Sequence, residues 1–387
     1  MQLTKKFVKA KNPCAGGYKW FIRDHNGQGD YQAVLDALVA DGRISDANWL
    51  LDQFGPTDAV LRLDSLDANA IVFAGTLEIR MGINVDTVVR AGRSIITGGG
   101  IRAGETIMAG ENITAAANIA SGGEIHAGGD ISADWGIESA SRLECRGNVR
   151  AKWDICAGQD LAVTGHLHAG QDVRAQGAIQ CGQGIKAGGD VRADHAINAT
   201  SGIQAGGAIH CGDHLASGWG MIAGGDIRAD GSIRAGEGVR ADGVIQAGDG
   251  HGVYAGLSVR LDAWSVCARV VAKERPAQLV SGYWAGQDAG GGVDEAEVAA
   301  SVGAATDAPT EPATVPAKEP ATVPATEPAP VPATESAAGA ATVPTPPSAS
   351  VAGSAVAGTV AGTGAGSIAG SIASAPPRSR PVSVALA

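Results

Sequence analysis

Residues 223–236 read AGGDIRADGSIRAG, and this short stretch contains the pattern that decides the fold. Ile227 and Ile233 lie six residues apart, and each is followed two residues later by a small residue, Ala229 or Ala235. A period of six fits neither a 3.6-residue helix nor a heptad. Inward residues at positions i and i+2 are instead typical of a β-strand.

The same spacing extends along the chain on both sides of this stretch. An aliphatic residue occupies every sixth position from Ile71 to Ile245, which makes 30 positions without a gap. Two residues after these positions, the places from Ala103 to Ala247 hold 18 Ala, three Ser, three Cys and one Val. The middle half of the chain is therefore one long run of similar six-residue units.

Each unit predicts a strand of about four residues followed by a corner of about two. Gly recurs in the corners, as at Gly104, Gly188 and Gly224, and Gly and Asp form turns or adopt positive φ at low cost. Strands and corners that follow one another in one rotational sense form a parallel β-solenoid. Three units per coil predict about ten coils of about 18 residues, and a rod on the order of 50 Å long. Two units per coil would give a flatter and longer rod.

Outward residues favour three units per coil, because several recur at a spacing of 18. Trp135 is then stacked on Trp153 one coil later, and Trp219 is a third outward Trp. Acidic and basic residues form two neighbouring columns: Asp154, Asp172, Asp190 and Asp226 beside Arg174, Arg192 and Arg228. Carboxylates would lie about 5 Å apart, and flanking guanidinium groups would offset their repulsion. The alternative is that the columns arise by chance in a repetitive, charged surface.

The composition limits the partners and the compartment. The net charge of −11 disfavours a nucleic-acid partner, and plain solubility explains an acidic balance more simply than mimicry of DNA. The six Cys contain no C-x-x-C pair, and Cys145, Cys181 and Cys211 fall on the small inward positions. This predicts free thiols in a reducing, cytoplasmic compartment. The start of the chain lacks the apolar run of a signal peptide, and no stretch has the hydrophobicity of a membrane span.

Residues 1–58 predict a small helical domain. Asp30 is the expected N-cap of a helix over 31–40, and Ser45 is the expected N-cap of a second helix over 46–54. Such a hairpin would cap the open edge of the first coil, because unpaired strand edges recruit other chains. The alternative is a module that docks a partner.

The first 28 residues carry basic side chains but no clear period. We expect them to be irregular, with Trp20, Phe21 and Ile22 available for docking.

Residues 59–285 form the predicted solenoid together with a C-terminal cap. The period breaks at His251, after which larger residues are expected to continue as strands: Leu257, Val259, Leu261, Trp264, Val266 and Val270. Residues 286–387 are rich in Pro, Ala and Thr and then in Gly, Ala and Ser, which predicts a disordered tail. The alternative, a weak membrane segment over 351–375, has too little hydrophobicity per residue.

The residues do not predict enzymatic chemistry. Hexapeptide acyltransferases carry a small residue two places before the aliphatic one, and a loop outside the coil helps to build their active site. Here that place holds residues such as Gln159, Gln171 or Trp219, and the six-residue count is never interrupted. His126 and His168 are outward but fall on different faces, as does His210. We therefore expect no catalytic residue, no cofactor and no metal site.

The stretch 223–236 resembles the repeats of the bactofilins, which are polymer-forming bacterial cytoskeletal β-helix proteins. It is also similar to repeats in the flagellar assembly protein A family. The resemblance covers about residues 71–260 and implies a right-handed, three-sided β-helix in a bacterial cytoplasm that joins end to end beside a Pro-rich disordered tail. This chain departs from the bactofilins in its length, its regularity and its helical hairpin, which would block growth through one end if it seals that end.

These observations predict a non-enzymatic structural or scaffolding protein. Self-association would use the solenoid ends, the coils near Ile71 or near Leu257, to form a homo-oligomer. The alternative is a platform on which Trp135, Trp153 and Trp219 bind a protein or a glycan, and an acyltransferase is the least favoured alternative. The sequence does not identify a particular partner.

Overall fold

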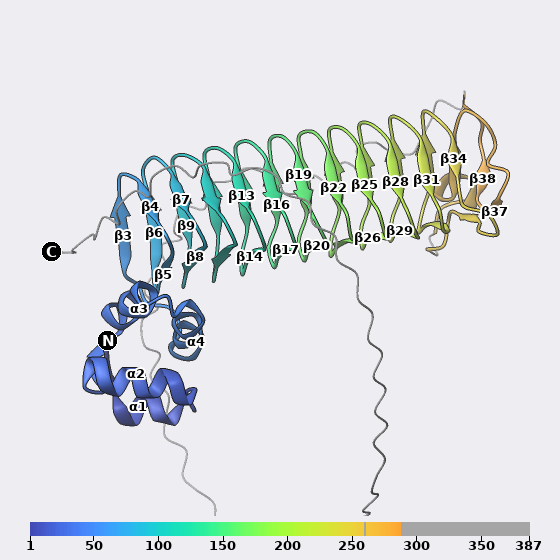
Figure 1. Ribbon diagram of the computed structural model, residues 1–387. Coiled ribbons are helices and arrows are strands. Elements are labelled where there is room, and N and C mark those ends of the chain that lie inside the picture. The colour runs from blue at the N-terminus through green and yellow to red at the C-terminus, as the bar shows by residue number, and fades with distance from the viewer. Residues whose placement is uncertain (259–260, 288–387) are drawn as a thin grey trace, which may run out of the picture. The chain divides into compact units, whose positions relative to one another are not determined.

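The computed structural model describes residues 1–258 and 261–287, which form a small helical domain followed by a parallel β-solenoid (Figure 1). The predicted fold class is confirmed. The predicted disordered tail, apart from Gly286 and Gln287, lies outside the described residues.

Three parallel sheets form the walls of the solenoid. Within the described residues they contain 11, 12 and 13 strands, and each sheet is named here by that number. Consecutive strands belong to different sheets, so the chain passes through all three sheets in each coil (Figure 1). The twelve-stranded sheet corresponds to about twelve coils in the described part, more than the ten predicted, because residues 60–68 and 253–284 add strands at the two ends.

The eleven-stranded sheet contains β4 (Leu66–Ala68), β7 (Ile83–Val85), β10 (Ile101–Ala103), β13 (Ile119–Ser121), β16 (Ile137–Ser139), β19 (Ile155–Ala157), β22 (Val173–Ala175), β25 (Val191–Ala193), β28 (Ile209–Cys211), β31 (Ile227–Ala229) and β34 (Ile245–Gln246). The twelve-stranded sheet contains β5 (Ile71–Phe73), β8 (Val88–Ala91), β11 (Thr106–Ala109), β14 (Ile125–Ala127), β17 (Leu143–Cys145), β20 (Leu161–Val163), β23 (Ile179–Cys181), β26 (Ile197–Ala199), β29 (Leu215–Ser217), β32 (Ile233–Ala235), β35 (Val253–Tyr254) and β37 (Leu279–Ser281). The thirteen-stranded sheet contains β3 (Val60–Leu63), β6 (Thr76–Ile79), β9 (Ile95–Thr97), β12 (Ile113–Ala115), β15 (Ile131–Ala133), β18 (Val149–Ala151), β21 (Leu167–Ala169), β24 (Ile185–Ala187), β27 (Ile203–Ala205), β30 (Met221–Ala223), β33 (Val239–Ala241), β36 (Arg269–Val271) and β38 (Tyr283–Trp284).

The pairing register confirms three units per coil. Each strand pairs in parallel with the strand three later, and the paired residues are 18 apart, as Ile185 and Ile203 are. This spacing holds from β5 to β34, so no loop interrupts the regular coils. Only the ends differ: Val60 pairs with Thr76, and Val239 pairs with Val270.

Nearly all three-residue strands of the regular coils bury their first and third residues, and the four-residue strands β6, β8 and β11 bury their second and fourth. Ile185 is 0% exposed and Ala187 is 3% exposed, whereas Lys186 between them points outward. Burial of an Ile stabilises the fold by roughly 1.5–3 kcal/mol relative to leaving it exposed. Most strands have three residues, one fewer than predicted, so the residue before each aliphatic residue lies in the corner.

The corner glycines have a different role from the predicted one. No glycine from Gly75 to Gly248 has a positive φ. At Gly188, an added Cβ would lie 2.1 Å from the carbonyl oxygen of Gly170 in the preceding coil. Gly therefore allows consecutive coils to approach closely at this corner. Of the two properties expected of the corner glycines, turning the chain and adopting positive φ, the second is not used.

The N-terminal domain is more ordered than predicted. It contains β1 (Gln2–Thr4), α1 (Lys5–Ala10), α2 (Ala15–His25), β2 (Gln28–Asp30), α3 (Tyr31–Ala40) and α4 (Ile44–Phe54). The prediction that residues 1–28 are irregular was wrong. β1 pairs with β2 in antiparallel fashion, and the segment between these two strands forms helices α1 and α2. Trp20 and Phe21 are buried with Leu35, and are not available for docking, while Ile22 is half-buried.

The two predicted helices are present, but only the first begins as expected. The Asp30 side chain accepts a hydrogen bond from the Gln32 N–H at the start of α3, as an N-cap does. Helix α4 instead begins at Ile44 after Arg43, which makes no side-chain capping bond. The prediction of Ser45 as N-cap was therefore wrong, and an Arg43–Asp46 ion pair spans this first turn.

Helix α3 covers the free edge of β5. The Gln32 amide nitrogen donates to the Val72 carbonyl at 3.1 Å, and the Ala74 N–H donates to the Gln32 amide oxygen at 2.9 Å. One side-chain amide thus makes the two bonds that a neighbouring strand would make. Val72 and Ala74 are buried in the core of the helical domain.

The C-terminal end departs from the predicted run of strands. Trp264 and Val266 lie in a short helix, α5 (Trp264–Cys267), and only Val270 of the expected residues lies in a strand, β36. Leu257 and Leu261 are exposed outside the strands, and Val259 lies outside the described residues. The segment that contains α5 lengthens the coil between β33 and β36, because Val239 pairs with Val270, 31 residues later.

Candidate functional site

The predicted acidic column is a ladder of hydrogen bonds between coils. Asp154, Asp172, Asp190 and Asp226 each lie in a corner directly before a strand of the eleven-stranded sheet. The Oδ1 atom of each accepts a hydrogen bond from the backbone N–H of the equivalent residue one coil later, at 3.0, 2.7, 2.7 and 2.8 Å respectively. These carboxylates satisfy backbone donors that would otherwise be left in the corners.

The other two corners use the same device. Before the thirteen-stranded sheet, the Asp130 N–H donates to Asn112 at 2.8 Å, the Asn148 N–H donates to Asp130 at 2.7 Å, and the His166 N–H donates to Asn148 at 2.8 Å. Before the twelve-stranded sheet, the Ala178 N–H donates to Asp160 at 2.9 Å. The ladder is therefore part of how the solenoid is built, and the sequence analysis missed it by considering charge alone.

The arginine column pairs with two of these four carboxylates. Arg174 pairs with Asp172, and Arg228 pairs with Asp226 at 2.9 Å. Arg192 lies 3.8 Å from another carboxylate, Asp194, in the corner that follows its strand. Among the described residues, no group of three or more His, Cys, Asp or Glu side chains could hold a metal ion.

Two of the three candidate tryptophans lie together. The rings of Trp135 and Trp153 are stacked, with centroids 6.3 Å apart and planes at 20°, and both side chains are more than half exposed. They occupy the corner after the thirteen-stranded sheet in consecutive coils. Trp219 follows β29 of the twelve-stranded sheet, so it lies on another corner. The exposed pair offers flat apolar surface to a partner.

One cluster has the residue types of a hydrolytic triad. The Ser232 hydroxyl lies 3.1 Å from Nδ1 of His214, and Nε2 of His214 lies 3.6 Å from Asp213. However, Ser232 is buried, and its own N–H donates to the same Nδ1 at 3.0 Å. His214 therefore acts as a rung of the corner ladder, and Ser232 has no access to a substrate.

Burial favours the neutral forms of three inward thiols and of one half-buried outward histidine. Burial raises the pKa of Cys145, Cys181 and Cys211 to about 11, and the Cys145 thiol donates to the Gly129 carbonyl at 3.0 Å. Burial, with smaller contributions from Arg150 and Lys186, lowers the pKa of His168. All six cysteines of the chain are free.

The predicted separation of the outward histidines is confirmed. His126, His168 and His210 lie on β14, β21 and β28, which belong to three different sheets.

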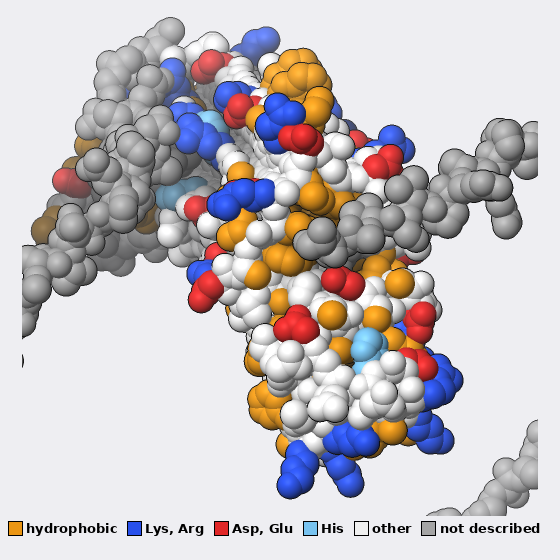
Figure 2. All heavy atoms as spheres, turned by 90° about the vertical axis from the view of Figure 1, so that its left-hand side faces the viewer, with side chains coloured by type: hydrophobic (Ala, Val, Ile, Leu, Met, Phe, Trp, Pro, Cys, Tyr) orange, Lys and Arg blue, Asp and Glu red, His pale blue; other side chains and the backbone are white. Residues whose placement is uncertain are grey.

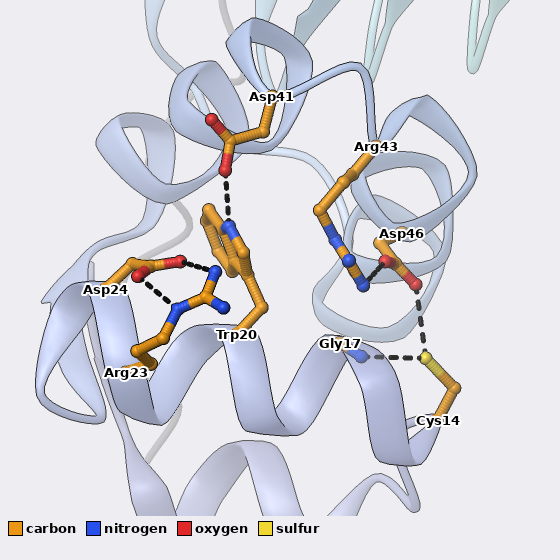
Figure 3. A network of polar contacts seen from close by, with 8 residues as sticks. All are labelled: Cys14, Gly17, Trp20, Arg23, Asp24, Asp41, Arg43 and Asp46. Atoms are coloured by element: carbon orange, nitrogen blue, oxygen red, sulfur yellow. Dashed lines mark hydrogen bonds and ion pairs between the residues drawn. The ribbon is translucent and has the colours of Figure 1, made fainter.

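A polar network holds the helical domain together (Figure 3). The Trp20 indole N–H donates to Asp41 at 2.6 Å, which joins α2 to the end of α3. The Cys14 thiol lies 3.3 Å from Asp46 and accepts the Gly17 N–H at 3.1 Å, which joins the start of α2 to α4. These contacts position the structural elements of the domain.

The C-terminal end of the solenoid exposes large apolar side chains. Six of them between residues 257 and 283 are at least 46% exposed: Leu257, Leu261, Trp264, Val266, Val280 and Tyr283. We call these residues the C-terminal apolar group. They lie in or beside α5, β37 and β38, after the regular coils have ended.

Comparisons with known proteins assign only the start of the chain. The family model described as the YdhT N-terminal domain matches residues 1–54, which end at the last residue of α4. No curated protein and no solved structure matches the chain. No helix in the described residues is long and apolar enough to cross a membrane. The helical domain is therefore similar to a family of N-terminal domains, and the resemblance of the solenoid to the bactofilins stays a prediction.

Proposed function

We propose that this protein is a non-enzymatic structural protein of the cytoplasm, in which the solenoid acts as a rigid spacer and its C-terminal end joins a second copy. The observation that carries the proposal is the difference between the two ends. At the N-terminal end, Gln32 covers the edge of β5. At the C-terminal end, the apolar group is exposed.

The strand edges and the exposed apolar side chains at the C-terminal end both favour association. β34, β37 and β38 are the last strands of their sheets within the described residues, so one edge of each is without a neighbouring strand. At the other end β3 and β4 are also terminal strands, so it is the exposed apolar group that distinguishes the C-terminal end. Unpaired edges recruit further strands, and exposed apolar groups mark sites of association. Two identical ends can join around a twofold axis, which places both helical domains at the outer ends. The resemblance of the repeats to the bactofilins supports end-to-end assembly of this kind.

The mass of the protein in solution tests the proposal. We expect light scattering to give a multiple of the 38.6 kDa chain mass, and a Leu261→Asp, Val280→Asp variant to give the monomer mass, because charges in an apolar interface oppose its burial. A matched control places Asp at Met81 and Ile96, which are exposed apolar residues of the regular coils. A monomeric wild-type protein at all concentrations would overturn the proposal.

A binding platform is the second candidate, and the exposed Trp135–Trp153 pair favours it. Stacked indole rings present flat faces of the kind that bind sugar rings. On this alternative, a neutral polysaccharide retards the protein in affinity gel electrophoresis, and Trp153→Ala abolishes the retardation. Trp219→Ala on the other corner serves as the control. A monomeric protein that binds such a glycan would favour the platform over assembly.

A further inference from the structure

The outer helices of the N-terminal domain concentrate positive charge in an otherwise acidic chain. Five of the nine lysines lie among the first 19 residues, and all five are exposed: Lys5, Lys6, Lys9, Lys11 and Lys19. The first three belong to α1, Lys11 follows it, and Lys19 belongs to α2. Figure 2 shows Lys and Arg side chains gathered at the lower end of the helical domain, where Figure 1 places α1 and α2. We call these five residues the lysine face.

Little within the first 30 residues neutralises this charge. Before Tyr31 the chain contains only two acidic residues, Asp24 and Asp30. Asp24 is held by two hydrogen bonds from Arg23, and Asp30 pairs with the N-terminal amine at 3.3 Å. No lysine of the face makes an ion pair within the part of the chain that the structure describes. In the later part of the domain, Asp41, Asp46 and Asp52 are engaged by Trp20, Arg43 and Arg90. The five lysines therefore have no direct carboxylate partner among the described residues and can attract an external anion.

An exposed aromatic ring lies among these charges. Phe7 of α1 is 45% exposed, and its inner side packs edge-on against Phe54 with ring centroids 5.0 Å apart. The Lys11 ammonium lies 5.9 Å from the centre of the Phe54 ring. Phe7 thus lies at the surface in the same helix as Lys6 and Lys9, while its neighbour Val8 enters the core.

This combination fits an anionic lipid surface better than a nucleic acid or an acidic peptide. Lysine is a point charge without the planar fork that Arg uses for phosphates and base edges, and the nearest Arg of α2, Arg23, is engaged by Asp24. Lysines beside an exposed aromatic residue are typical of peripheral binding at a bilayer, where the charges attract anionic headgroups and the ring enters the interface.

We propose that the lysine face, with Phe7 at its edge, binds the surface of an anionic membrane peripherally. The acidic remainder of the chain would be repelled by the same surface. Binding through this face therefore orients the helical domain towards the lipid. This inference is independent of assembly through the C-terminal end.

Co-sedimentation of the full chain with vesicles tests the proposal. We expect binding to vesicles in which about a third of the lipid is phosphatidylglycerol, none to pure phosphatidylcholine, and release by salt, because screening weakens the attraction. Each lysine near the surface is worth about fivefold in affinity. A Lys6→Glu, Lys9→Glu, Lys19→Glu variant should therefore bind at least about 100-fold more weakly, and Phe7→Ala several-fold more weakly.

A matched control variant distinguishes the effect of the lysine face from the effect of the total charge of the chain. Lys152, Lys186 and Lys273 lie in the solenoid and are changed to Glu in the control variant, which carries the same net charge as the test variant. Equal loss in both variants, or binding to neutral vesicles as strong as to anionic ones, would overturn the proposal. So would binding of polyglutamate or duplex DNA without binding of vesicles, since the partner would then be a soluble polyanion. Circular dichroism melting of each variant shows that the fold is retained.

Discussion

At the residue scale, the third position of each strand decides whether the coils can close. Ala187 and Ala205 are paired neighbours on β24 and β27, and both are almost fully buried. Ala187→Leu or Ala205→Leu should lower the free energy of unfolding by about 1–3 kcal/mol, because the narrow interior has no space for the added atoms. Gln183→Leu, in an exposed corner, is the control. Equal melting temperatures for the buried and exposed variants would contradict the inward assignment.

The corner ladder makes a second prediction at the same scale. Asp172 accepts from the Asp190 N–H and donates its own N–H to Asp154. Asp172→Ala should cost about 1–2 kcal/mol, because the Asp190 donor loses its partner, whereas Asp172→Asn keeps an acceptor oxygen and should cost less. Urea unfolding of the two variants measures the difference. If both lose the same stability, the ion pair to Arg174 and not the ladder is the important interaction.

The buried thiols should be inert while the protein is folded. Cys145, Cys181 and Cys211 have a pKa of about 11, above the ordinary thiol value of 9.0, so they remain protonated at pH 8. Iodoacetamide at pH 8 should modify the exposed Cys14 and leave these three unmodified by mass spectrometry. Since a raised pKa favours the folded state below the unfolded value, this stabilisation should disappear as the pH rises from about 9 to about 11. Rapid modification of all three would place them outside the core.

At the scale of elements, the helical domain and the first coil are joined by Gln32. Gln32→Met keeps the length of the side chain but removes both bonds to the edge of β5. We expect the Ala74 amide to exchange its hydrogen at least about tenfold faster, because an edge strand without a partner opens more readily. Gln28→Met, an exposed position in β2, is the control. Unchanged exchange at Ala74 would mean that packing alone protects the edge.

Regular elements were predictable from the sequence, whereas contacts between distant segments were not. The inward positions around Ile185 follow from a period that one side of a strand imposes on every coil. The pairing of Leu3 with Gly29 has no local signal, and without it Trp20 looks like a surface residue. The four-residue helix α5 is too short for a helical period.

The corner ladder was not predicted, although the sequence contained a signal for it. Its bonds run from side chains to backbone N–H groups, so a search for opposite charges does not find them. The signal was nevertheless present in the chain, because Asn112, Asp130 and Asn148 recur at intervals of 18 directly before aliphatic residues. An Asp or Asn at that position predicts a rung.

At the scale of the whole molecule, we propose that function lies at the two ends of the molecule and not along the faces of the solenoid. In the regular coils the Asp column binds backbone N–H groups of the next coil, and two of its carboxylates pair with Arg174 and Arg228. The features available to partners are the lysine face, the C-terminal apolar group and, on the alternative function, the exposed Trp135–Trp153 pair. A rigid spacer with different ends can hold two binding partners at a fixed separation, which is on the order of 50–60 Å for about twelve coils.

Electron microscopy of the purified full chain tests the central claim most directly, because it shows which ends meet. We predict rods joined in pairs, each pair about twice as long as a single solenoid and with the helical domains at its two outer ends. The Leu261→Asp, Val280→Asp variant should give single rods. Wild-type rods that remain single at every concentration, or that meet at their helical ends or along their sides, would contradict assembly through the C-terminal end.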